Sequence, residues 1–111
     1  DVLEKDDRRR DMPRFQGENI AQNFKLVARL KELAREEGCS PAQLAIAWLL
    51  NRKPFIVPLP GTKRRKWLKE NLAAAAIVPS ETTMLAIDGV FEPDAVQGTR
   101  YPEGALKRLG I

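Results

Sequence analysis

The apolar residues between positions 23 and 37 recur at the spacing of an α-helix. They follow one another at steps of three and four residues: Leu26, Val27, Leu30, Leu33 and Ala34. Charged residues fill most of the remaining positions, so the segment predicts an amphipathic helix over residues 23–37. Gly38 follows directly and is the expected stop signal at the helix end.

A second helix is predicted from Pro41 to about Asn51. Ser40 stands at its N-cap, Pro41 at its first position and Gln43 at N3, which completes a capping box. The residues that follow are apolar almost all round the helix. We therefore expect this helix to be buried rather than displayed on the surface.

Residues 55–59 form a continuous apolar run, Phe-Ile-Val-Pro-Leu. Such a run is typical of a parallel strand that is covered on both faces. A strand needs neighbours for its backbone hydrogen bonds, and no run of comparable quality occurs elsewhere in the sequence. The pattern therefore predicts one strand that belongs to a larger sheet protein.

Gly61 supplies a turn after this run, and Thr62 or Lys63 is expected to open a third helix that ends near Ala75. Four cations follow in the predicted first turn: Lys63, Arg64, Arg65 and Lys66. A helix N-terminus carries about +0.5 elementary charge and has free backbone N–H groups, so it favours anions over cations. A phosphate bound there would satisfy both the amides and the cations. The alternative is a solvated basic face without a ligand.

Helical spacing divides this third helix into two stripes. One stripe is polar and contains Lys63, Trp67, Glu70 and Asn71. The adjoining stripe is apolar and is expected to pack: Leu68, Leu72, Ala75 and Ala76.

The two ends of the chain carry weaker patterns. Residues 1–22 show no sustained period and are expected to form a loop with at most a short helical turn. Ser80 is the predicted N-cap of a fourth helix, and a brief helix is predicted near residues 103–109. The fourth helix is expected to supply core residues: Met84, Leu85, Ile87, Val90 and Phe91.

Composition fits one globular domain. The 111 residues are 43% hydrophobic and 31% charged, and no apolar run approaches the ~20 residues that cross a bilayer. We therefore expect neither a membrane span nor a signal peptide. The single Cys39, read as a structural residue, and the absence of a secretory signal favour a cytoplasmic location.

Charge and missing residue types limit the chemistry. The net charge of +4 suits a phosphate-bearing partner, either a nucleotide or a nucleic acid. The sequence contains no histidine, so the commonest general base and transition-metal ligand is absent, and no metal site is expected. The chain begins with Asp1 rather than Met, a weak hint of a processed or truncated product.

The order strand, Pro-Gly-Thr turn, basic helix start and Glu70-Asn71 resembles the last strand and following helix of the aldo-keto reductases. The segment Ser40 to Leu50 is similar to the same family, as are residues 23–37 and the tail around residues 100–102. The resemblance implies an α/β fold, with this chain as the carboxyl-terminal part of a TIM (β/α)8 barrel. Within that single partial domain, residues 1–22 would be a loop. Residues 23–111 would supply the last helix, one strand, the cofactor helix and the carboxyl-terminal helix and tail.

The resemblance also implies which residues hold NADP(H). Four would bind its 2′-phosphate and adenosine ribose: Gly61, Thr62, Lys63 and Arg64. Glu70 and Asn71 would form hydrogen bonds with the adenine edge. Many relatives carry Arg where this chain has Trp67, which can stack on adenine but supplies no charge. Lys63 and Arg64 would then carry more of the preference for NADP over NAD.

The catalytic residues of the family are not matched in this chain. Relatives reduce aldehydes and ketones with an Asp, Tyr, Lys and His from upstream strands, and Tyr101 is expected to pack in the tail instead. The resemblance therefore implies a fragment of an NADP-dependent oxidoreductase that carries a cofactor half-site and is inactive alone.

Two other interpretations come from different classes. A small basic helical module could bind nucleic acid through residues 63–66 and 8–10, although residues 45–48 offer no polar side chains for base readout. A structural interpretation is that exposed apolar surface on residues 41–50 and 55–59 drives self-association. We expect the fragment to be oligomeric, and we favour the reductase interpretation.

Overall fold

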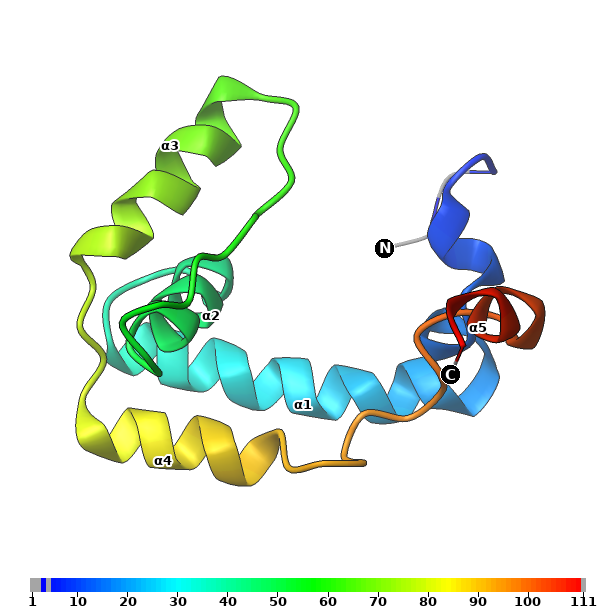
Figure 1. Cartoon of the computed structure of the whole chain (residues 1–111). Coiled ribbons are helices and arrows are strands. Elements are labelled where there is room, and N and C mark those ends of the chain that lie inside the picture. The colour runs from blue at the N-terminus through cyan, green and yellow to red at the C-terminus, as the bar shows by residue number, and fades with distance from the viewer. Residues whose placement is uncertain (1–2, 4, 111) are drawn as a thin grey trace. The chain divides into compact units, whose positions relative to one another are not determined.

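The computed structural model describes residue 3 and residues 5–110, which form helices and irregular segments (Figure 1). The α-helices are α1 (Gly17–Glu36), α2 (Pro41–Leu50), α3 (Arg65–Ala73), α4 (Glu81–Val90) and α5 (Glu103–Leu109). The short 3-10 helices are η1 (Arg8–Asp11), η2 (Pro13–Phe15) and η3 (Ala74–Ala76). The described residues divide into two compact units, one from the residues up to Val27 and from Phe91 onward, the other from Ala28–Val90.

The second unit holds the buried residues of the described chain. Its buried side chains are Leu33, Ala34, Leu44, Ala47, Ala74, Thr83 and Ile87. Leu44 of α2 is fully buried, and α2 packs against η3 and α3. The capping box predicted for α2 is confirmed, because the Ser40 hydroxyl accepts from Gln43 N at 3.2 Å and Gln43 Oε1 accepts from Ser40 N at 3.0 Å.

The predicted burial of α2 and α4 is only partly observed. On α2, Leu44 and Ala47 are buried and the other apolar side chains are half-buried or exposed. On α4, Ile87 is buried, whereas Leu85 is 65% exposed. The described residues pack against only one face of each helix. The apolar side chains on the other face are therefore partly exposed to solvent.

A carboxylate joins α2 to α4. Trp48 Nε1 donates to Asp88 Oδ1 at 2.9 Å, and Arg52 forms an ion pair with Asp88 Oδ2 at 2.6 Å. The Arg52 guanidinium also lies 5.1 Å from the centroid of the Trp48 ring. One Asp88 side chain therefore holds the indole and the guanidinium that stack on each other.

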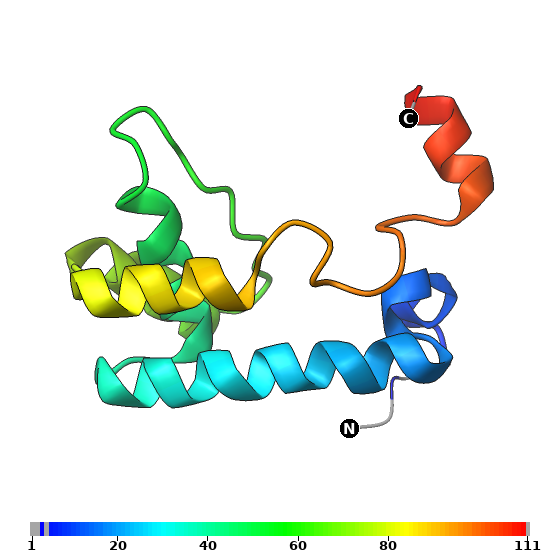
Figure 2. The same cartoon turned by 90° about the horizontal axis from the view of Figure 1, so that it is seen from below.

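A second carboxylate joins the end of α1 to the start of α4, which lies alongside the later turns of α1 (Figure 2). Glu37 Oε1 accepts from Ser80 N at 3.1 Å and from Ser80 Oγ at 2.7 Å. The Ser80 hydroxyl in turn accepts from Thr83 N at 3.2 Å, which confirms Ser80 as the N-cap of α4. Hydrogen bonding by Thr83 and Ser80 lowers the pKa of Glu37.

The strand predicted over residues 55–59 is not confirmed. The segment has no regular secondary structure, and the described residues form no strand. Phe55 and Val57 are each 78% exposed, and Leu59 is 94% exposed. A ladder of backbone hydrogen bonds requires a neighbouring strand, and the described residues supply none.

Helix α1 begins earlier than the sequence pattern predicts. It starts at Gly17, six positions before the expected Asn23, and residues 8–11 and 13–15 form two short 3-10 helices where a loop with at most one short helical turn is expected. Extending an existing helix adds one hydrogen bond per residue fixed, so residues 17–22 join it without a sustained apolar period of their own. The predicted helix over Glu103–Leu109 is confirmed as α5.

In the first unit, side chains of α1 and η2 hold the backbone of the tail. Asn23 Oδ1 accepts from Gln97 N at 2.8 Å, and its Nδ2 donates to Gln97 O at 2.9 Å. Arg14 Nε donates to Gly98 O at 3.2 Å. Gly98 has φ +84°, and a Cβ there would lie 2.9 Å from the Pro13 carbonyl, so the close approach requires glycine.

No helix of the described residues is long and apolar enough to cross a membrane.

Replacing Leu44 by alanine should destabilise the second unit by about 2–5 kcal/mol, because the change leaves a cavity in its centre. Leu59→Ala is the matched control, since the same atoms are removed from a side chain that is 94% exposed. Urea unfolding followed by circular dichroism measures both. Equal decreases in the free energy of unfolding for the two variants would contradict the placement of Leu44 in the core.

Glu37→Gln tests the link between α1 and α4 through its pH dependence. The pKa of Glu37 is lowered from its ordinary value of 4.5 in the folded chain, so its carboxylate stabilises fully above that pH. This stabilisation is lost as pH falls through the folded pKa. Thermal unfolding of the parent and variant should therefore differ at neutral pH and converge in acid.

Glu36→Gln is the control for this experiment, because the Glu36 carboxylate forms no hydrogen bond within the described residues. A parent–variant difference for Glu37→Gln that persists unchanged to pH 2 would exclude the proposed role of its charge.

Candidate functional site

The second unit contains a groove of about 600 Å³ at the start of α3. Its lining residues are Ala42, Gly61, Thr62, Lys63, Trp67, Glu70 and Asn71. Six of the seven predicted site residues lie on this groove, and Arg64 does not. The segment before α3, one face of α3 and the first turn of α2 together form its walls.

The start of α3 differs from the prediction. The helix begins at Arg65, and Arg64 is its N-cap, with no side-chain hydrogen bond to the free amides. Thr62 is therefore not the N-cap. Its hydroxyl accepts from Arg64 N at 3.4 Å and donates to Arg64 O at 3.2 Å. A threonine hydroxyl can bond the backbone two residues on, which closes a local turn in place of a helix cap.

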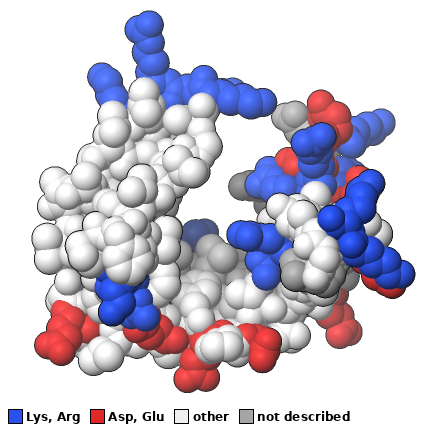
Figure 3. Space-filling model, viewed as in Figure 1, with Lys and Arg blue, Asp and Glu red and all other residues white. Residues whose placement is uncertain are grey.

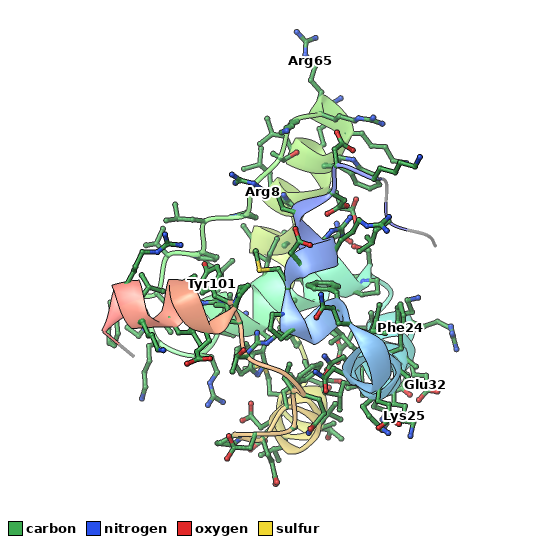
Figure 4. All side chains as sticks on the ribbon, turned by 90° about the vertical axis from the view of Figure 1, so that its right-hand side faces the viewer. Arg8, Phe24, Lys25, Glu32, Arg65 and Tyr101 are labelled. Atoms are coloured by element: carbon green, nitrogen blue, oxygen red, sulfur yellow. The ribbon has the colours of Figure 1, made fainter. Side chains whose placement is uncertain are left out.

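This shift changes where the four cations lie. Lys63 and Arg64 precede the helix, and only Arg65 and Lys66 occupy its first turn. Lys and Arg side chains project around this end of α3 (Figure 3), and Arg65 points away from the chain (Figure 4). Among the described residues, no carboxylate pairs with any cation of residues 63–66. Lys63 is the cation that lines the groove.

Trp67 provides an apolar wall beside this charge. Its side chain is 44% exposed and lines the groove, and Lys66 Nζ lies 4.6 Å from its ring centroid. A cation on an indole face gains from the ring quadrupole. Lys63 and Trp67 therefore give the groove an ammonium group and an aromatic surface.

The polar stripe of α3, and not its apolar stripe, faces α2. Leu68 is 46% exposed and Leu72 is 66% exposed, so the packing predicted for them is not observed. Ala74, at the end of α3, is buried instead. The contact between the helices is made by Glu70 through hydrogen bonds, which leaves the leucines on the outer side.

Glu70 is bonded at both its side chain and its backbone. The Ser40 hydroxyl donates to Glu70 Oε1 at 2.5 Å, and Gln43 Nε2 donates to Glu70 O at 3.2 Å. Both donors belong to the capping box of α2. The sequence indicates Ser40 and Gln43 as capping residues, but nothing in their spacing indicates a bond to a residue about thirty positions away.

Ala42 lines the groove and is not predicted by the sequence pattern. An alanine carries no chemical signal, and its place in the wall follows only from the packing of α2 against α3.

Residues 2–92 match the Aldo/keto reductase family. This match covers most of the chain. The chain belongs to the aldo/keto reductase family.

Three members of this family illustrate the similarity. The chain is 40% identical to "Aldo-keto reductase yakc [NADP(+)]" of Schizosaccharomyces pombe over 103 residues. It is 34% identical to "Aldo-keto reductase str7" of Strobilurus tenacellus over 100 residues. It is 39% identical to "Probable aldo-keto reductase 1" of Glycine max over 92 residues.

These alignments cover 93%, 90% and 83% of the chain but only 30%, 30% and 27% of the three aldo/keto reductases. The chain thus spans less than a third of the length of these relatives.

Proposed function

We propose that this chain supplies the adenosine 2′-phosphate half of the NADP(H) site of an oxidoreductase that reduces aldehydes and ketones. The observation that carries the proposal is the groove, which gathers Lys63, Trp67, Glu70 and Asn71 around a cationic helix start. Family membership and the name of the yeast relative, which includes NADP(+), support the choice of cofactor.

The donor set of the groove fits a phosphate. Lys63 has no carboxylate partner among the described residues, and the first amides of α3 are not capped by a side chain. An anion bound beside them would gain charge-assisted hydrogen bonds. Lys63 and Arg64 would hold the 2′-phosphate, with Gly61 and Thr62 shaping the turn beside the ribose.

The remaining side chains of the groove fit an adenine ring. The exposed face of Trp67 offers a stacking surface, and Glu70 and Asn71 offer hydrogen-bonding groups on the next turn. Glu70 Oε1 is already bonded to Ser40, so Oε2 is the oxygen left for the adenine amino group. When bound, NADPH supplies the hydride for carbonyl reduction. The residues of this chain would bind and orient its adenosine end.

The same proposal includes the predictions for residues 55–59 and for the catalytic residues. Residues 55–59 would pair with other strands of a (β/α)8 barrel, and the catalytic residues would come from outside this chain. The cytoplasmic location and the self-association stay predictions.

Nucleic-acid binding gains no support in the first unit. Of the arginines in η1, Arg9 pairs with Asp7 at 2.6 Å, and Arg10 donates to Leu3 O at 3.1 Å.

Calorimetry with adenosine 2′-phosphate and adenosine tests the phosphate site. The chain should bind adenosine 2′-phosphate about tenfold or more tightly, because charge-assisted hydrogen bonds distinguish the two ligands. The double variant Lys63→Ala/Arg64→Ala should lose most of this preference.

The matched control is Lys31→Ala/Arg35→Ala, which removes the same charge from two exposed residues of α1 that do not line the groove and lie outside the start of α3. It should keep the preference at 0.15 M salt, where the screening length is about 8 Å. Equal binding of the two ligands by the unmodified chain would refute the proposed site.

A further inference from the structure

The side chain of Ser40 lies behind the groove and contacts one of its wall residues. It does not line the groove, yet its hydroxyl donates to Glu70 Oε1 at 2.5 Å. Both residues are half-buried. The contact joins the residue before α2 to the middle of α3.

The direction of this bond is fixed by the capping box. A serine hydroxyl has one proton to donate, and its oxygen also accepts from Gln43 N at 3.2 Å. Because the acceptor side of the oxygen faces the first turn of α2, the proton is directed to Glu70. Ser40 therefore holds Glu70 as a consequence of capping α2.

Gln43 fixes the backbone of the same glutamate. Its Nε2 donates to Glu70 O at 3.2 Å, while its Oε1 accepts from Ser40 N at 3.0 Å. The two side chains of one capping box thus bind the side chain and the main chain of one residue on another helix. The capping box of α2 therefore fixes both the backbone position and the side-chain rotamer of Glu70.

We propose that Ser40, supported by Gln43, is a positioning residue that orients the Glu70 carboxylate for recognition of an amino-purine over an oxo-purine. Oε1 is bonded to Ser40, and Oε2 accepts no hydrogen bond from the described residues, so it is available to a ligand in the groove. A carboxylate accepts from the exocyclic amino group of adenine and repels the carbonyl oxygen of hypoxanthine. Fixing its rotamer before binding removes part of the entropy cost. This inference rests on the proposed adenosine site.

The test compares adenosine 2′-phosphate with inosine 2′-phosphate, which differ in the amino or oxo group at C6, where Glu70 would bind, and in the proton on the neighbouring N1. The measured quantity is the ratio of their dissociation constants for the chain, obtained by calorimetry. Effects that alter phosphate binding or overall stability act on both ligands and cancel in this ratio. The unmodified chain should prefer the adenine ligand by about tenfold or more.

Ser40→Asp separates capping from positioning. Aspartate caps a helix as well as serine does, so α2 should fold normally. It has no proton to donate to Glu70 and places a like charge beside it. The preference for adenine should fall to about twofold or less, whereas Ser40→Thr, which keeps the hydroxyl, should retain it.

Ser80→Ala is the matched control. Ser80 caps α4 and donates to Glu37 Oε1 at 2.7 Å, so it makes the same pair of bonds as Ser40, but neither Ser80 nor Glu37 lines the groove. Ser80→Ala should lower the stability of the chain and leave its preference for the adenine ligand unchanged. Ser40→Ala should lower both the stability and this preference.

The possible results distinguish the positioning role of Ser40 from the proposed adenosine site itself. If the unmodified chain does not distinguish the two ligands, Glu70 does not read adenine and the inference falls, whereas the 2′-phosphate site is decided by the separate comparison of adenosine 2′-phosphate with adenosine. If the chain distinguishes them and Ser40→Asp does so equally well, the adenosine site stands and the positioning role of Ser40 is overturned.

Discussion

The hydrogen bonds between the capping box of α2 and Glu70 of α3 determine the shape of the candidate site. Ser40 and Gln43 hold the glutamate by its side chain and its backbone, and Ala42 between them lines the groove. Because its walls come from α2, α3 and the segment before α3, the groove exists only while α2 and α3 stay packed together. The bonds also explain why α3 turns its polar face inward and leaves Leu68 and Leu72 outside.

Charge at the start of α3 is the second feature that shapes the site. The helix end is positive, its amides lack a side-chain cap, and none of the cations at residues 63–66 has a carboxylate partner within the described residues. Like charges placed together on a helix N-terminus repel one another and the helix dipole. A bound phosphate relieves this repulsion, which is the physical basis of our proposal for the 2′-phosphate of NADP(H).

The described residues expose more apolar surface than a self-contained core would leave. Phe55, Val57 and Leu59 are largely exposed, and so is Leu72 of α3. Membership of the aldo/keto reductase family offers an account, since neighbouring strands and helices of a barrel would cover this surface. A run that is apolar on both faces is stable as a strand only between such neighbours.

Local patterns in the sequence determined the existence and most boundaries of the helices. The capping box at Ser40, the cap at Ser80 and the shared face of Trp67, Glu70 and Asn71 follow from helical spacing, and the structure contains them. Lys63 precedes α3 and lines the same groove without belonging to the helix. Helix α3 begins at Arg65 because the Thr62 hydroxyl closes a local turn with Arg64. Residue spacing alone does not show whether Thr62 forms such a turn or caps the helix. Which stripe of α3 packs, and that Ser40 bonds Glu70, were decided only by tertiary structure. Periodicity specifies the residues that share a face, whereas the partner of that face depends on contacts between segments far apart in the chain.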